Sequence, residues 1–193
     1  KSTLDHYLEK RVPKWKVRES IKKYRENKEI LEQIAKEYGV QARFIVALWG
    51  LETNFGKIQG KFPIMSAVTT LAYEGRRESF FRKQIFASLQ ILKEGHITLD
   101  KYVGSWAGAM GQSQFIPTTY LSFAVDYDKD GKKDIWTNKK DVFASIANYL
   151  KKNGWDDELT WGRQVKLPNG FNAKLAGLQK NKMKRLKEWA DLG

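Results

Sequence analysis

A mainly α-helical fold is predicted by three features of the sequence. Apolar residues recur at the spacing of one helix face in several segments, for example Ile21, Tyr24, Leu31 and Ile34. The segment 42–53 is apolar nearly all round, which is typical of a helix at the centre of a domain. The one strand-like piece that we identify, 164–167, is short. Helices packed around one central helix are therefore expected.

Caps and breakers place the expected elements along the chain. Ser20 is expected to cap a first helix, 20–38, which Gly39 ends. Further helices are predicted at 42–53, 64–73, 77–93, 141–152 and 182–192. Gly, Ala, Ser and Gln dominate 104–117, which favours a loop with short turns. We expect residues 1–193 to form a single domain, with a small, partly β insertion at 156–185.

Composition limits the classes of function. Hydrophobic residues make up 41% of the 193 residues, with 7 Trp, which is enough for a packed core. The absence of cysteine excludes disulfides and thiolate zinc sites. No apolar run reaches the ~18 residues of a membrane span. The formal net charge of +13 favours an anionic partner: nucleic acid, anionic lipid or an acidic cell-wall polymer.

Glu52 is the first candidate catalytic residue. It is the only ionisable residue between Arg43 and Lys57, and it lies at the C-terminal end of the apolar segment. Loss of hydration and the negative end of the helix dipole would both raise its pKa, as an acid catalyst near neutral pH requires. Position alone leaves a second interpretation open, in which Glu52 faces outward at a frayed helix end.

Four segments in order resemble the lytic transglycosylase B family of the lysozyme-like superfamily. They are 48–56 (LWGLETNFG), 70–73 (TLAY) with its following Arg and Phe pairs, 108–120 (GAMGQSQFIPTTY), and 145–150 (SIANYL) with 153–155 (NGW). The resemblance spans most of residues 4–190. It implies a lysozyme-like helical core and an enzyme that cleaves peptidoglycan between N-acetylmuramic acid and N-acetylglucosamine.

In this family a single glutamate acts first as acid and then as base. The resemblance assigns that role to Glu52: it protonates the glycosidic oxygen, then helps the 6-hydroxyl of the same sugar attack the anomeric carbon. The product is a 1,6-anhydromuramoyl end, without water and without the second carboxylate of ordinary glycosidases. The resemblance implies that no cofactor is required. The resemblance also implies substrate-binding roles for Tyr7, Arg76, Arg77, Ser105, Gln114, Phe115 and Tyr149.

These roles differ in kind. Tyr149 would orient Glu52 and stabilise the developing positive charge, and Gln114 would bond a sugar or the catalytic carboxyl. Ser105 would line the cleft, and Tyr7 falls at the spacing of an N-terminal cleft tyrosine. Arg76 or Arg77 would grip a peptide-stem or lactyl carboxylate. Phe115 fits stacking on a sugar or packing in the core equally well.

An acidic segment, 126–134, reads as the start of a calcium loop. Oxygen ligands would come from Asp126, Asp128, Asp130, the backbone carbonyl of Lys132, and Asp134, with Gly131 at the turn. Thr137 stands at position 12, where a bidentate Glu is usual, so Asn138 or Asp141 could substitute only if the loop were re-routed. Two interpretations stay open: a structural Ca²⁺ site, or an Asp-rich turn that caps the next helix.

The remaining expectations concern partners and location. The expected partner is the glycan strand of peptidoglycan. The protein is expected to bind it as a monomer in the bacterial periplasm. A lipid anchor outside these residues is compatible with the resemblance. Nucleic acid is not expected, because the lysines are scattered rather than interleaved with aromatic residues. A hydrolytic muramidase of the same fold and a non-catalytic wall-binding module remain the alternatives. Family members usually continue past the segment that resembles 186–193 toward the cleft, so the chain is expected to be truncated or a shorter variant.

Overall fold

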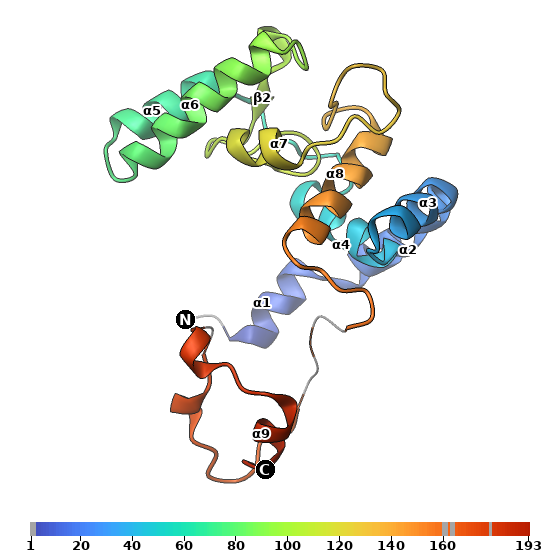
Figure 1. Ribbon diagram of the computed structural model, residues 1–193, viewed down its shortest axis with the longest axis vertical. Helices are drawn as coiled ribbons and strands as arrows, with labels where there is room; N and C mark the ends of the chain where they lie inside the picture. Colours follow the sequence, from blue (N-terminus) through green and yellow to red (C-terminus); the bar gives the residue numbers. More distant parts are fainter. Residues whose placement is uncertain (1–2, 160–161, 163–164, 178) are drawn as a thin grey trace. The chain divides into compact units, whose positions relative to one another are not determined.

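The computed structural model describes residues 3–159, 162, 165–177 and 179–193. The chain divides into two compact units, Lys1–Asp157 and Glu158–Gly193. In the first unit the helices are α1 (Leu4–Arg11), α2 (Lys14–Glu26), α3 (Lys28–Tyr38), α4 (Ala42–Thr53), α5 (Ile64–Tyr73), α6 (Glu78–Lys93), α7 (Pro117–Phe123) and α8 (Lys139–Lys152) (Figure 1). The mainly helical fold predicted from the sequence is confirmed.

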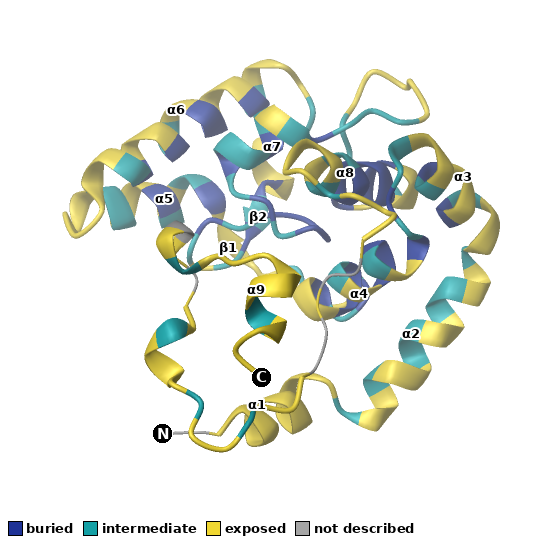
Figure 2. Ribbon diagram, turned by 60° about the horizontal axis from the view of Figure 1, so that its bottom comes forward, coloured by how far each residue is buried: buried dark blue, intermediate teal, exposed yellow. Residues whose placement is uncertain are grey.

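The core of the first unit lies around α4 and α8. Ile45 and Trp49 of α4 are fully buried, and the Trp49 ring meets the ring of Phe143 of α8 edge-on, with 5.0 Å between their centroids. Buried residues also cover the inner faces of α3, α5 and α6 (Figure 2). The central helix expected from its apolar sequence is therefore α4, with the predicted bounds.

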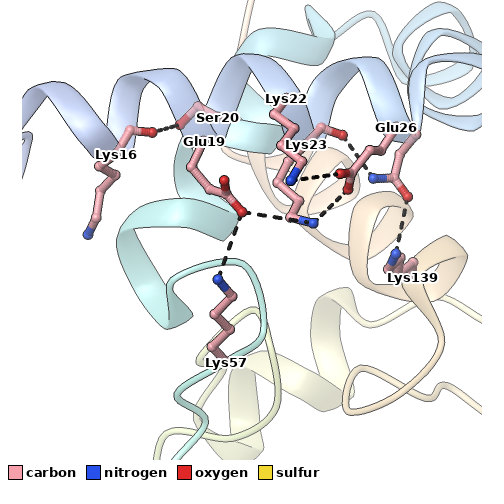
Figure 3. Close-up of polar contacts among 9 residues, drawn as sticks. Lys16, Glu19, Ser20, Lys22, Lys23, Glu26, Lys57 and Lys139 are labelled. Carbon is pink, nitrogen blue, oxygen red and sulfur yellow. Dashed lines mark hydrogen bonds and ion pairs between the residues drawn. The ribbon is translucent and has the colours of Figure 1, made fainter.

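The expected helix 20–38 is instead two helices that meet at Asn27. The Asn27 side chain donates to the carbonyl of Lys23 (2.8 Å), and its backbone leaves the helical region (φ −122°, ψ 20°). Asparagine competes for backbone bonds in this way, which explains the break. The expected cap, Ser20, lies inside α2 and donates to the carbonyl of Lys16 (2.9 Å) (Figure 3).

Short pairings fold the loop that precedes α7. Strands β1 (Phe62–Pro63) and β2 (Val103–Gly104) pair antiparallel, with Phe62 opposite Gly104. Isolated bridges then join Gly104 to Met110 and Met110 to Phe115. The predicted loop with turns at 104–117 thus has a defined path, and helices α5 and α6 pack side by side next to it (Figure 1).

The second unit is described by itself. It contains turns of 3₁₀ helix at Ala173–Leu175 and Lys180–Lys182 and the helix α9 (Leu186–Ala190), shorter than the predicted 182–192. The rings of Phe171 and Trp189 lie 6.4 Å apart. Of the expected strand 164–167, residue 164 lies outside the described residues and 165–167 form no strand. The predicted insertion 156–185 thus differs in bounds from this unit, and its described part contains no strand.

Among the described residues, none of the helices combines the length and the apolar composition needed to span a membrane.

Candidate active site

Glu52 lies on the last turn of α4, and the chain reverses directly after it. Asn54, Phe55 and Gly56 all adopt left-handed backbone conformations, with φ of 51°, 61° and 81°. Phe55 folds back so that its ring packs edge-on against Trp49, at 5.5 Å between centroids. A Cβ atom at Gly50 would lie 2.6 Å from that ring, so only glycine fits there. The segment 48–56 is therefore built to end a buried helix abruptly behind Glu52.

Two contacts hold this turn in place. The hydroxyl of Thr53 accepts a hydrogen bond from the backbone N–H of Gly56 (3.0 Å). Beyond the turn, the ammonium of Lys57 lies 3.8 Å from a carboxylate oxygen of Glu19 in α2, and Glu19 also faces Lys23 at 3.9 Å (Figure 3). Surface ion pairs contribute about 0–1 kcal/mol each, so the buried packing of Phe55 contributes more to the turn than Lys57 does.

Glu52 lines a cavity of about 220 Å³ in the first unit. One wall comes from α4, a second from the segment 113–116 with the start of α7, and a third from α8. The lining residues are Leu48, Glu52, Ser113, Gln114, Phe115, Ile116, Thr119, Ile146 and Tyr149. Glu52 is the only carboxylate among them, so a second acid is absent from the described lining.

Partial burial raises the pKa of Glu52 above the usual value for a glutamate, and the positive charge of Arg11 partly opposes this shift. The raised pKa agrees with the direction expected from the sequence. A carboxyl with a raised pKa keeps its proton closer to neutral pH and can donate it to a leaving group. The cavity therefore contains a single group suited to general acid catalysis.

Tyr149 lines the same cavity as Glu52, from the α8 wall. Its ring packs against Phe115 (5.6 Å between centroids) and edge-on against Phe123 (5.1 Å), while 37% of the residue stays exposed. Phe115 is almost fully buried, so it both packs in the core and lines the cavity. The two flanking phenylalanines fix the orientation of the phenol next to the catalytic candidate.

Gln114 lines the same cavity from a left-handed backbone position, with φ of 51°. Its side-chain amide nitrogen donates to the carbonyls of Gln59 (3.2 Å) and Gly111 (3.0 Å). The amide oxygen accepts no hydrogen bond from a described residue, which leaves an acceptor for a hydroxyl or N–H of a ligand. The side-chain nitrogen of Gln114 therefore donates to backbone carbonyls, and its oxygen is the atom left for a ligand.

The comparisons with known proteins identify the family. The family model described as Transglycosylase SLT domain matches residues 1–193. The chain belongs to this family. It is 32% identical over 174 residues to the membrane-bound lytic murein transglycosylase B of Escherichia coli (strain K12), covering 87% of this chain and 48% of that protein.

Solved structures of other proteins resemble this chain closely. SltB3 from Pseudomonas aeruginosa in complex with NAG-NAM-pentapeptide is 42% identical, with a TM-score of 0.93, over 100% of this chain and 51% of that one. The Escherichia coli lytic transglycosylase Slt35 in complex with calcium is 32% identical, with a TM-score of 0.74, over 78% of this chain and 48% of that one. The chain thus spans about half the length of the relatives that it matches.

Four of the substrate-binding residues predicted from the sequence lie outside the cavity that Glu52 lines. The hydroxyl of Ser105 accepts from the backbone N–H of Ala109 (3.0 Å) and so shapes the loop. The guanidinium of Arg77 lies over the Phe80 ring, 4.0 Å from its centroid, and Arg76 is exposed before α6. Tyr7 is exposed on α1, one helical turn from Arg11.

The acidic loop gathers a different set of carboxylates from the one expected. Oxygens of Asp126, Asp128 and Asp141 lie within 4.8 Å of one another. Asp130 and Asp134 are not part of this group and instead accept hydrogen bonds from backbone N–H groups, Asp130 from Lys132 (2.8 Å). Asp134 accepts from Trp136 and Thr137, both at 2.8 Å. Asp141 of α8 lies near Asp126 and Asp128 because the loop folds back onto α8. The sequence pattern allowed Asp141 as a ligand only under such a re-routing of the loop.

Asp141 is fully buried, and this burial raises its pKa to about 6, with the nearby charges of Asp128 and Asp126 acting in the same direction. Hydrogen bonds from the backbone N–H groups of Tyr127 and Asp134, both 2.8 Å, oppose the shift. Within the described part of the chain, none of the three carboxylates forms an ion pair. The donor set is all oxygen, as hard divalent cations prefer.

Two residues that matter to the site, Arg11 and Gln112, were not found from the sequence, and Asp141 was named there only as a conditional substitute. Arg11 acts on Glu52 from α1, Asp141 completes the carboxylate group, and Gln112 bonds to the helix that carries Glu52. Gln112 belongs to the motif 108–120, but nothing in its type or spacing separates it from its neighbours Ser113 and Gln114.

Proposed function

We propose that this chain is the catalytic part of a peptidoglycan lytic transglycosylase. The observation that carries the proposal is a lone carboxyl, Glu52, with a raised pKa, in a cavity whose described lining has no second carboxylate. Most hydrolytic glycosidases use two carboxyl groups, one as acid and one as base or nucleophile. A single carboxyl can serve both roles in turn if the substrate supplies its own nucleophile.

The reaction balances with Glu52 alone. Protonated Glu52 gives its proton to the oxygen that links the muramic acid to the next glucosamine, and the C1–O bond breaks. The carboxylate then takes the proton of the muramic 6-hydroxyl as that oxygen bonds to C1. The products are a free glucosamine hydroxyl and a 1,6-anhydro ring, and Glu52 ends protonated, as it began. No water is consumed.

Neighbouring residues fit supporting roles in that reaction. The phenol of Tyr149, held by its flanking rings, would stabilise the developing positive charge and orient Glu52. Gln114 would accept a hydrogen bond from a sugar group, and Phe115 would contact a ring. Tyr7, Arg76, Arg77 and Ser105, which lie outside the cavity itself, would contact more distant parts of a glycan strand or its peptide stem.

The relatives support this choice of substrate. A Pseudomonas aeruginosa SltB3 structure, 42% identical, is a complex with NAG-anhNAM-pentapeptide, in addition to the complex with NAG-NAM-pentapeptide. A structure described as a muramidase/transglycosylase, 32% identical, keeps hydrolysis of the same bond as the second candidate. With peptidoglycan as the partner, we expect the protein to act in the bacterial envelope, in the periplasm, as a monomer.

Product mass distinguishes the candidates. Purified peptidoglycan digested by the chain should give muropeptides that lack one water relative to the hydrolysed form. The Glu52→Gln variant should release none, while Glu29→Gln, which changes an exposed carboxyl of α3, should match the parent. Hydrolysed ends alone would identify a muramidase. Equal release by Glu52→Gln and the parent would contradict any catalytic role for Glu52.

A calcium ion fits the acidic loop as a structural ligand. Asp126, Asp128 and Asp141 would hold it, with the backbone carbonyl of Lys132 available from the loop, while Asp130 and Asp134 shape the turn. Bound Ca²⁺ would neutralise three clustered carboxylates and brace the loop against α8. No catalytic step depends on it.

Thermal unfolding tests the calcium site. Ca²⁺ should raise Tm, because a ligand that binds only the folded state stabilises it. The increase should shrink as the pH falls below about 6, since protonation of Asp141 competes with the cation. Asp128→Asn should reduce the increase, and Asp100→Asn, outside the group, should leave it unchanged. A Tm that does not respond to Ca²⁺ at neutral pH would refute the site.

A further inference from the structure

The cavity at Glu52 is formed by segments that are distant in sequence. Leu48 and Glu52 come from α4, and the segment 113–116 faces them from the loop before α7. The cavity width, and with it the amount of water around the carboxyl, depends on how these two walls are joined. One residue, Gln112, bonds the helix α4 through both its side chain and its backbone, directly before the second wall.

Gln112 is 7% exposed and its polar groups contact both sides of the junction. Its amide oxygen accepts from the indole N–H of Trp49 in α4 (2.7 Å), and its amide nitrogen donates to the carbonyl of Trp136 (2.8 Å). Its own carbonyl accepts from the hydroxyl of Thr53 (3.0 Å), and its N–H donates to the carbonyl of Ile135 (2.8 Å). It is thereby bonded to α4 twice and to 135–136 twice.

The contacts on α4 flank the catalytic candidate. Trp49 precedes Glu52 by three positions and Thr53 follows it by one, so both ends of the turn that carries Glu52 are bonded to Gln112. The chain reversal after the helix also lies close to Gln112: a Cβ atom at Gly56 would lie 2.3 Å from the Gln112 amide oxygen. Gln112 directly precedes the wall residues 113–116, so it cannot move without moving that wall.

We propose that Gln112 is the positioning residue of this site, fixing the distance between the Glu52 turn and the wall formed by 113–116. The inference rests on the proposed function. Gln112 does not line the cavity and acts only through Glu52 and the wall. Without its two side-chain bonds the walls can separate, and more water reaches the carboxyl, which is only partly buried in the intact site. The pKa of Glu52 then falls toward that of an ordinary glutamate.

The test uses methionine in place of glutamine, which keeps the length of the side chain and removes both of its hydrogen bonds. Gln112→Met is compared with Gln84→Met. Gln84 is 2% exposed, and its side-chain amide also makes two hydrogen bonds. Its nitrogen donates to the carbonyl of Phe80 (3.3 Å), and its oxygen accepts from the backbone N–H of Thr118 (3.0 Å). Both variants lose a buried amide, so both lose stability. Gln84 bonds the start of α7, whereas only Gln112→Met loses a bond to the helix that carries Glu52.

For Gln112→Met we expect kcat on peptidoglycan to fall roughly tenfold or more, with KM changed much less, since a misplaced acid slows chemistry rather than binding. The basic limb of the pH profile should move to lower pH. Gln84→Met should keep the parental kcat and profile. Equal kcat and equal basic limbs in the two variants would overturn the inference.

A second variant covers the case in which Gln112→Met fails to fold. In Gln112→Glu the protonated carboxyl can accept from Trp49 and donate to Trp136 as the amide does, whereas the ionised form cannot donate. Its activity relative to the parent should therefore recover as the pH is lowered. A constant ratio across the pH range would contradict the role of the second bond.

Carbon-13 NMR titration of the Glu52 carboxyl in the full chain separates this inference from the proposed function. If the parent releases no anhydro products, the proposed function fails, and the titration still shows whether Gln112→Met lowers the Glu52 pKa. An active parent with a Glu52 pKa unchanged by Gln112→Met would refute the positioning role alone.

Discussion

At the residue scale, two opposing influences set the proton affinity of Glu52. Burial in the cavity raises its pKa, and the charge of Arg11 lowers it. The balance matters because a general acid works only while it holds its proton. Activity is therefore expected to fall as the pH rises through the Glu52 pKa, and this basic limb should lie above the usual range of a glutamate.

Removing the charge of Arg11 gives a prediction with a definite sign. In Arg11→Ala the opposing influence is gone, the pKa of Glu52 rises further, and the basic limb of the activity profile should move to higher pH. The measurement is kcat on soluble glycan strands across the pH range. Lys10→Ala, on the same helix, serves as the control because Lys10 does not act on Glu52. A limb that stays in place in Arg11→Ala would show that Arg11 has no influence in solution.

Tyr149 offers a second prediction at this scale. Tyr149→Phe keeps the ring between Phe115 and Phe123 and removes only the hydroxyl. We expect kcat to fall roughly 10- to 100-fold, the equivalent of one hydrogen bond to a charged group, with Tm nearly unchanged. Tyr73→Phe, an equivalent change at a tyrosine that is 94% exposed and outside the cavity, should leave kcat unchanged. Full activity of Tyr149→Phe would remove the hydroxyl from the mechanism.

The same residues show what a sequence can reveal. Glu52 could be named as a candidate because a lone carboxyl at the end of an apolar run is visible as a local pattern, and the resemblance of the segment 48–56 to a known family then assigned its catalytic role. Gln112 could not, because its partner Trp49 lies 63 positions away and only the folded chain brings the two together. Asp141 could be named only as a conditional ligand, because it lies outside the twelve-residue loop pattern and reaches Asp126 only through the turn of the chain.

At the element scale, helices follow the sequence wherever burial and local signals agree. The bounds 42–53 and 64–73 are those predicted, because apolar residues end at strong breakers on both sides. The predicted helix 20–38 is wrong in its middle, since the Asn27 side chain competes for the backbone while the apolar stripe continues past it. Strands β1 and β2 are too short to leave a periodic pattern, so only the fold reveals them.

The turn after α4 allows a prediction about stability. Gly56→Ala places a Cβ atom in a left-handed conformation and within 2.3 Å of the Gln112 amide, so it should cost more than the left-handed backbone alone. Gly95→Ala isolates the backbone cost, because Gly95 has a similar φ of 75° and no atom within 4 Å of the added Cβ. We expect about 1 kcal/mol for Gly95→Ala and about 3 kcal/mol for Gly56→Ala in urea unfolding. Equal losses would mean that the turn adapts without strain.

At the scale of the whole molecule, the family match covers the full chain, yet the relatives are about twice as long. The folded chain contains the cavity, the lone acid and the acidic loop. Its charge is unevenly shared between the two units. Residues 158–193 include eight Lys and Arg against three Asp and Glu, a formal charge of +5 within a chain total of +13. The smaller unit therefore has the higher density of positive charge.

This charge should bring the protein to an anionic polymer. Stem peptides carry carboxylates, so binding to peptidoglycan should weaken as salt rises, because ions screen surface charges beyond about 10 Å at 0.1 M. Reversing three exposed lysines of the second unit (Lys166→Glu, Lys184→Glu and Lys187→Glu together) should lower the affinity and flatten its salt dependence. Sedimentation with insoluble peptidoglycan at a series of salt concentrations measures both.

The matched control reverses three exposed lysines of the first unit, Lys36, Lys83 and Lys93, and changes the net charge by the same amount. If only the net charge of the molecule determined binding, the two triple variants would lose the same amount of affinity. We expect the second-unit variant to lose more, because its charges are concentrated on a short segment and act together on one stretch of polymer. A larger loss in the first-unit variant would assign the attraction to the first unit instead. Salt-independent binding by the parent would show that the positive charge serves no part in recognition.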